Sequence, residues 1–187
     1  MYKKGFLILV MYHLVGLTSC RECGSSIPFY DFKAMSVYSI NPDVAIDDSL
    51  VFRLSPQDLN YLTETSFNFS LFKTANALSC IENGYSGPKY PVSKISITSN
   101  ADFDALHPSG TSLNDIVLVK ELMVGSTFIP LTSFDSAALF VGDVYVSRQQ
   151  FYIARRPTSA KEHVLTIAVQ KSNGETLAVE TELIAWD

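Results

Sequence analysis

Three cysteines are the residues of this sequence with the widest choice of chemistry: Cys20, Cys23 and Cys80. A cysteine thiol can be acylated, can pair in a disulfide, or can bind a metal ion as its thiolate. An odd number of cysteines in an exported chain implies that one is used differently from the other two. The residues that precede Cys20 indicate which one.

Cys20 follows a segment with the order of a lipoprotein signal peptide. A short basic start leads into an almost wholly apolar stretch over residues 6–17, which is shorter than the roughly 20 residues that span a bilayer core. Leu17-Thr18-Ser19-Cys20 then has lipobox order, in which the thiol receives diacylglycerol and cleavage frees the Cys20 amine. The sequence therefore predicts a signal peptide over 1–19 and a membrane anchor on Cys20. An ordinary secretory signal and an uncleaved anchor are the alternatives.

Cys23 and Cys80 then form an even pair in an oxidising compartment, where disulfides persist. A bridge between them would stabilise the fold by about 4 kcal/mol on the chain-entropy model. The alternative is two free thiols, with Cys23 in a flexible tether. A metal site is disfavoured, because two cysteines without a nearby histidine pair supply too few zinc ligands.

A Gly- and Pro-rich segment over residues 82–91 carries Tyr85 and Tyr90. Loops on a rigid scaffold often carry binding functions, and two tyrosines there could stack on a sugar ring. Recognition of a glycan or of an envelope protein by this loop is one hypothesis. The alternative is a long connection whose tyrosines pack on the sheet.

The other chemistry-bearing residues have simpler structural interpretations. Asn100, Asp102 and Asp104 offer alternate oxygen atoms, with His107 close behind, but the glycine and distal acid of a calcium loop are missing. Asx-rich turns explain such a segment. We expect His163 to be a solvated residue at a strand edge. We therefore predict no catalytic residues, no metal and no cofactor, with an envelope hydrolase as the remaining alternative.

Composition excludes one class of partner. The chain has 47% hydrophobic and 18% charged residues, as globular domains do, with a net charge of −5. Removal of residues 1–19 takes away two lysines and no acid, so the mature net charge becomes −7. Such a surface repels phosphate backbones, so nucleic acid is not an expected partner.

The elements that position these residues are mostly strands. Apolar residues alternate or cluster in short runs separated by turn residues, which favours β-structure. The runs cover 33–40, 50–54, 67–72, 92–98, 117–119, 127–131, 143–154, 163–171 and 176–185. The last two flank Asn173-Gly174, which predicts a hairpin with a type I′ turn. We expect one face of this hairpin to be buried, with Leu165, Ile167 and Val169 on one arm and Leu177, Val179, Thr181 and Leu183 on the other, and the alternation of 92–98 places Ile95 and Ile97 on one face. Helical signals are limited to short turns, with Ser55 and Pro56 as the start of one over 55–59.

These strands predict an all-β fold, namely an antiparallel two-sheet β-sandwich of Ig-like type with a few short helical turns. We expect a tether over residues 20–30 and a single domain over 31–187. Leu17–Cys20, with 95–104 and 110–116, resembles small Bacteroidetes-type envelope lipoproteins of unknown function. That resemblance implies a β-sandwich on the cell envelope, anchored to the outer membrane, and supplies no catalytic residues. Surface display in that group is linked to acids after the cysteine, and only Glu22 fits here, so the membrane face stays open.

Overall fold

The computed structural model describes residues 29–39, 43–44, 49–62, 86–121, 127–141 and 148–186. Within these residues the fold is all-β, and helical structure is limited to two short 3-10 turns. The elements in chain order are β1 (Phe29–Ser39), β2 (Asp43–Val44), β3 (Leu50–Leu62), β4 (Val92–Ser99), β5 (Val117–Glu121), β6 (Phe128–Pro130), η1 (Leu131–Ser133), η2 (Ser136–Ala138), β7 (Gln149–Ile153), β8 (Glu162–His163), β9 (Leu165–Lys171), β10 (Thr176–Glu180) and β11 (Ile184–Trp186). This confirms the all-β part of the predicted fold class, and β1 begins two residues before the expected start of the domain.

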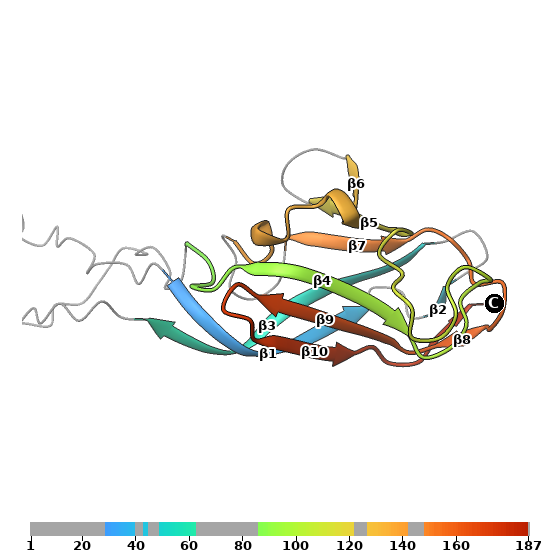
Figure 1. Cartoon of the computed structure of the whole chain (residues 1–187), viewed down its shortest axis with the longest axis horizontal. Helices are drawn as coiled ribbons and strands as arrows, with labels where there is room; N and C mark the ends of the chain where they lie inside the picture. The colour runs from blue at the N-terminus through green and yellow to red at the C-terminus, as the bar shows by residue number, and fades with distance from the viewer. Residues whose placement is uncertain are drawn as a thin grey trace, which may run out of the picture.

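The described strands form three sheets. The largest has the order β1-β3-β7-β5-β6, a second has β10-β9-β4, and a third has β2-β11-β8. All pairs are antiparallel except β2 with β11. The sheet of β4, β9 and β10 crosses in front of β1 and β3, and β2, β8 and the C-terminus lie at the end of the molecule away from the start of β1 (Figure 1).

Alternating apolar residues explain why β4 and β9 pair as they do. Ile97 lies opposite Ile167, and Ile95 lies opposite Val169. All four side chains are buried in one hydrophobic cluster that also contains Phe32, Phe52 and Leu54 from the larger sheet. A one-residue slip of this register would expose the apolar face, and each such side chain contributes about 1.5–3 kcal/mol when fully buried.

The predicted helical turn at Ser55 and Pro56 is wrong, because both residues continue strand β3. They lie opposite Ser36 and Met35 of β1, and Pro56 is buried. Burial against the partner strand therefore overrides the local capping signal. Asp58, two residues further on, has a left-handed φ of 52°, an uncommon conformation for a residue with a side chain.

Beside this part of β3, the set of β1 residues that faces the core changes. Tyr30 and Phe32 are buried in the first half of β1, whereas Met35 is the buried side chain and Val37 is half-buried in the second half. The inward positions thus change from even to odd numbers between residues 32 and 35. The sequence pattern of 33–40 indicated only the odd-numbered inward positions of the second half of β1.

The predicted β9–β10 hairpin is confirmed, but its turn is of another kind. A type I′ turn needs positive φ at both central residues, whereas Gly174 has a φ of 88° and Asn173 is not in that region. Gly174 N donates to Lys171 O at 2.9 Å, and Lys171 N donates to Glu175 O at 2.8 Å. This is a three-residue loop that ends on a left-handed glycine. Asn173 Oδ1 accepts from Glu175 N at 3.1 Å and supports that geometry.

The second arm of the hairpin is shorter than predicted. β10 ends at Glu180, and Leu183, which we expected on the inward face, is 56% exposed. Thr181 is buried as predicted, and its Oγ1 accepts from Leu165 N at 3.0 Å. The chain then leaves the hairpin, because Ile184–Trp186 pair with β8 and β2 in a different sheet.

Candidate functional site

Four of the residues singled out from the sequence lie outside the described part of the chain. These are Cys20, Cys23, Cys80 and Tyr85, so the lipid, the disulfide and the first loop tyrosine stay predictions. Tyr90 is half-buried, and Lys89 Nζ lies 5.4 Å from the centroid of its ring. This arrangement lies in the range of a cation–π contact.

The described end of the 82–91 loop is fixed to the start of β1. Tyr30 N donates to Gly87 O at 3.1 Å, and Lys89 N donates to Tyr30 O at 2.7 Å. Gly87 has a φ of 99°, and a Cβ there would lie 3.3 Å from Val141 Cα. Only glycine satisfies both the left-handed backbone and that close approach. The loop therefore covers the free edge of β1 at Tyr30.

A charged cluster lies beside this covered edge, where the hairpin turn meets β1. Lys171 Nζ lies 2.8 Å from Asp31 Oδ1 and 3.0 Å from Glu175 Oε2, and it also donates to the carbonyl of Phe32. The Lys171 side chain is fully buried. Lys33 Nζ contacts the same two carboxylates at 2.9 and 3.4 Å from the solvent side. We call these four side chains the Lys171 cluster: Asp31, Lys33, Lys171 and Glu175.

Electrostatics in the Lys171 cluster favour the charged forms of Asp31, Lys33 and Glu175. Burial raises the pKa of Asp31, but hydrogen bonds from Lys171 and Lys33 outweigh burial and hold it below its usual value. The hydrogen bond from Lys171 lowers the pKa of Glu175, and burial opposes this only in part. The hydrogen bond to Asp31 raises the pKa of Lys33. The cluster thus joins β1 to the β9–β10 hairpin by charge.

A groove of about 390 Å³ lies beside the second half of β1 and the end of β10. Its lining is Met35, Ser36, Val37, Tyr38 and Ser39 from β1, with Val179, Glu180 and Glu182 from the hairpin side. We call it the β1–β10 groove. β1 and β10 are each the last strand of their own sheet, so the groove lies between two sheet edges.

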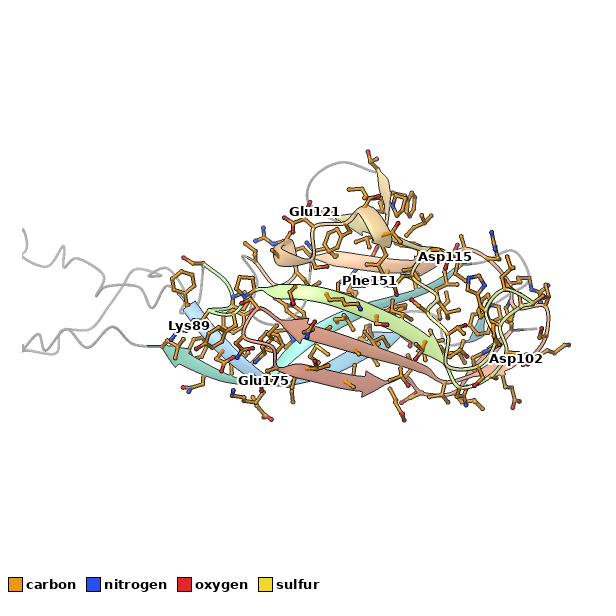
Figure 2. The ribbon with its side chains drawn as sticks, in the orientation of Figure 1. Lys89, Asp102, Asp115, Glu121, Phe151 and Glu175 are labelled. Carbon is orange, nitrogen blue, oxygen red and sulfur yellow. The ribbon has the colours of Figure 1, made fainter. Side chains whose placement is uncertain are left out.

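The opposite end of the domain carries a second charged cluster. Figure 2 shows Asp102 and Asp115 toward that end, and Lys89 and Glu175 toward the other. The buried His107 places Nδ1 2.7 Å from Asp104 Oδ1 and Nε2 3.0 Å from Asp115 Oδ1. Burial lowers the pKa of His107, but the hydrogen bonds to the two carboxylates outweigh burial and raise it above its usual value.

The oxygen atoms weighed as metal ligands serve this loop instead. Asn100 Oδ1 accepts from Val164 N at 2.8 Å, and Asp102 Oδ1 accepts from Ser109 N at 2.7 Å. Asp104 Oδ1 accepts from Leu106 N at 2.8 Å as well as from His107. The Asp104–Leu106 bond spans two residues and matches the Asx-turn interpretation, whereas Asn100 bonds a backbone amide 64 residues away. In the parts of the chain that the structure describes, no group of three or more acidic, histidine or cysteine side chains is placed to hold a metal ion.

The expectation that His163 is solvated is wrong. Its ring is fully buried, 5.2 Å from the Trp186 ring and 5.3 Å from the Phe103 ring. Nε2 donates to the Ala160 carbonyl at 3.0 Å, so Nδ1 accepts from the Ser99 hydroxyl at 2.7 Å. Burial lowers the pKa of His163, against a smaller opposing effect of the Ala160 bond. Both side chains of this serine–histidine pair are buried, and aromatic rings flank the histidine.

Lys171 is the residue that sequence reasoning missed, although a signal was present. Leu165, Ile167 and Val169 were assigned to the inward face of β9, and Lys171 continues the same alternation. A lysine at an inward strand position is rarely buried without a partner. The pattern could therefore have indicated a buried ion pair, but not which acids complete it.

No protein-family model matches this chain, and no curated protein or solved structure is similar to it. Within the described residues, no helix has the length and apolar character needed to cross a bilayer.

Proposed function

We propose that this protein is a lipid-anchored component of the cell envelope, held at the outer membrane through Cys20, with a binding or structural role. The observation that carries the proposal is the lipobox at residues 17–20, placed shortly before the first strand. Phe29, where β1 begins, lies nine positions after Cys20. A segment of that length reaches at most about 30 Å when fully extended. The domain would therefore stay close to the lipid headgroups.

The position of Phe29 implies an orientation for the anchored domain. β1 begins at the end of the molecule that carries the Lys171 cluster, and the C-terminus lies at the other end (Figure 1). In the anchored protein the Lys171 cluster therefore faces the membrane, and the loops around His107 face away from it. A disulfide between Cys23 and Cys80 would further shorten the free part of the tether.

For the architecture we propose an Ig-like two-sheet sandwich. Its support is the shared hydrophobic cluster between the five-stranded sheet and the β10-β9-β4 sheet. Antiparallel sheets whose inner faces interdigitate in this way are characteristic of β-sandwiches.

Several contacts support a binding or structural role over catalysis. The described serine–histidine pair is sealed in the core, and the carboxylates around His107 bond to that histidine and to loop amides. Recognition of a glycan or envelope protein by the 82–91 loop is supported by its fixed backbone at Gly87 and Lys89, which would hold Tyr90 in place. An envelope hydrolase has no comparable support.

Replacement of the lipidated cysteine tests the anchor. Cys20→Ala and the matched control Cys23→Ala are expressed from the full chain in a Gram-negative host supplied with a labelled fatty acid. We expect the wild type and Cys23→Ala to carry label and to sediment with membranes, and Cys20→Ala to do neither. Label on Cys20→Ala, or its absence from the wild type, would refute the proposal.

A further inference from the structure

The two halves of the β1 edge differ in how they are covered. Near its start, Gly87 and Lys89 bond the backbone of Tyr30, and Lys171 donates to the Phe32 carbonyl. Over Met35–Ser39, no strand of the described chain pairs with β1 from the groove side. An uncovered edge offers backbone donors and acceptors to another extended chain. Within the described residues, the second half of β1 thus lies beside β10 without pairing with it, whereas the first half is covered by backbone bonds.

The β1–β10 groove has the lining that an extended peptide requires. Val37 and Val179 are half-buried and offer apolar surface for alternate side chains, whereas Met35 is 8% exposed and contributes little. Tyr38, 67% exposed, stands at the rim. Strand addition uses backbone bonds for affinity and alternating pockets for specificity. Both components are present along this half of β1.

Charge selects the chemistry of the occupant. Glu180 and Glu182 line the groove and are exposed, and no cationic side chain of the described residues contacts either one. The whole chain is acidic as well. Lysine or arginine side chains of a partner would find free carboxylates here, whereas an acidic peptide would be repelled.

A second copy of this chain is a poorer occupant. A two-fold dimer across this edge would bring equivalent patches together, so Glu180 and Glu182 of one copy would approach those of the other. Like charges at a contact weaken association. The same carboxylates that attract a basic strand therefore oppose self-pairing.

We propose that the β1–β10 groove binds an extended basic segment of a partner protein, which adds as a strand along Met35–Ser39 with its lysine or arginine side chains on Glu180 and Glu182. The proposal does not depend on the lipid anchor, because all of its residues belong to the folded domain. It assigns the partner by chemistry, as a peptide in which apolar and basic residues alternate.

Fluorescence anisotropy with labelled peptides tests the proposal on the full-length protein in detergent. The probe is a short peptide of alternating lysine and valine, and its control alternates glutamate and valine. We expect the lysine peptide alone to bind, and Glu180→Lys with Glu182→Lys to weaken it about tenfold or more. Glu162→Lys changes an exposed acid of β8 that does not line the groove, and it should leave the affinity unchanged. Circular dichroism confirms that each variant is folded.

Methylation of alternate backbone nitrogens of the lysine peptide separates strand addition from simple charge attraction. We expect the methylated peptide to lose affinity, because strand pairing needs those N–H groups. Equal binding of the methylated peptide would overturn the proposal, as would equal losses in Glu162→Lys and the groove variant. A dimer of the wild-type chain that the groove variant abolishes would assign the groove to a second copy and also overturn it.

Discussion

At the end of the domain where β1 begins, Lys171 lies between Asp31 and Glu175, and at the opposite end His107 lies between Asp104 and Asp115. The two arrangements share a buried cationic or titratable group held by two carboxylates. They differ in how far apart the paired residues lie in the sequence. Lys171 and Asp31 are 140 residues apart in sequence, whereas His107 is three residues from one partner and eight from the other.

Because of this difference in sequence separation, the two sets of ion pairs stabilise different parts of the fold. The Lys171 cluster ties the first strand of one sheet to the hairpin of another, so its loss weakens the packing of the whole domain. The His107 contacts close a loop on itself, so their loss loosens that loop. Ion pairs in a fold are therefore better ranked by what they connect and how deeply they are buried than by their number.

Lys171→Met gives the largest expected effect. Methionine keeps much of the side-chain volume but removes the charge and the donor to the Phe32 carbonyl. Loss of one partner of a buried pair leaves the other uncompensated, and we expect a loss of about 3 kcal/mol in the free energy of unfolding. Lys33, which still contacts Asp31, keeps the loss from being larger. Urea denaturation measures it.

The double variant Lys171→Met with Asp31→Asn is the control for this change. It removes the uncompensated charge, so part of the lost stability should return. A Lys171→Met protein with wild-type stability would show that the cluster does not hold the two sheets together.

Acid is the next largest perturbation, and it acts on the Lys171 end. The pKa values of Asp31 and Glu175 lie below their ordinary values of 3.8 and 4.5. Their contribution to stability is therefore complete above about pH 4.5 and is lost as the pH falls through the lowered pKa values. Urea midpoints measured as the pH falls below 4.5 should drop more steeply for the wild type than for Lys171→Met. Parallel curves would contradict the assignment.

The smallest expected effect comes from the His107 end. The pH dependence of His107 itself has the opposite sign, whereas its partner Asp104 has a lowered pKa like the acids of the Lys171 cluster. The pKa of His107 is raised above 6.5, so its contribution is complete below that pH and is lost as the pH rises through the raised pKa. His107→Gln should cost about 1–2 kcal/mol at pH 6 and should remove this dependence. Hydrogen exchange at the Leu106 amide should show the loosening, while amides of β9 stay protected. Equal loss of protection in β9 would contradict a local role.

Local sequence patterns predicted the strands in which apolar residues alternate regularly. They failed where residues distant in the sequence determine the secondary structure or the burial of a side chain. Ile95 and Ile97 alternate over β4, and the structure buries both. Ser55 and Pro56 carry a sound local signal for a helical turn, but pairing with β1 places them in a strand. The residues next to His163 in the sequence do not indicate that it is buried, because its ring is enclosed by Phe103 and Trp186 from other parts of the chain. Local patterns contain the propensity of a segment but not the neighbours that cover it.

The candidate sites divide in the same way. The Leu17-Thr18-Ser19-Cys20 order can be recognised from the sequence because a processing enzyme reads it as a linear segment. The β1–β10 groove could not be predicted, because it exists only where the last strands of two sheets lie side by side.

Residue order alone was enough to predict the all-β class, the β9–β10 hairpin and the inward positions of β4 and β9, because strand periodicity is a local property of the chain. The packing of the sheets was needed to show that Lys171 meets Asp31, that β10 ends at Glu180, and that Glu180 and Glu182 line a groove beside β1. These outcomes depend on how the sheets pack, and packing is a property of segments brought together from distant parts of the sequence.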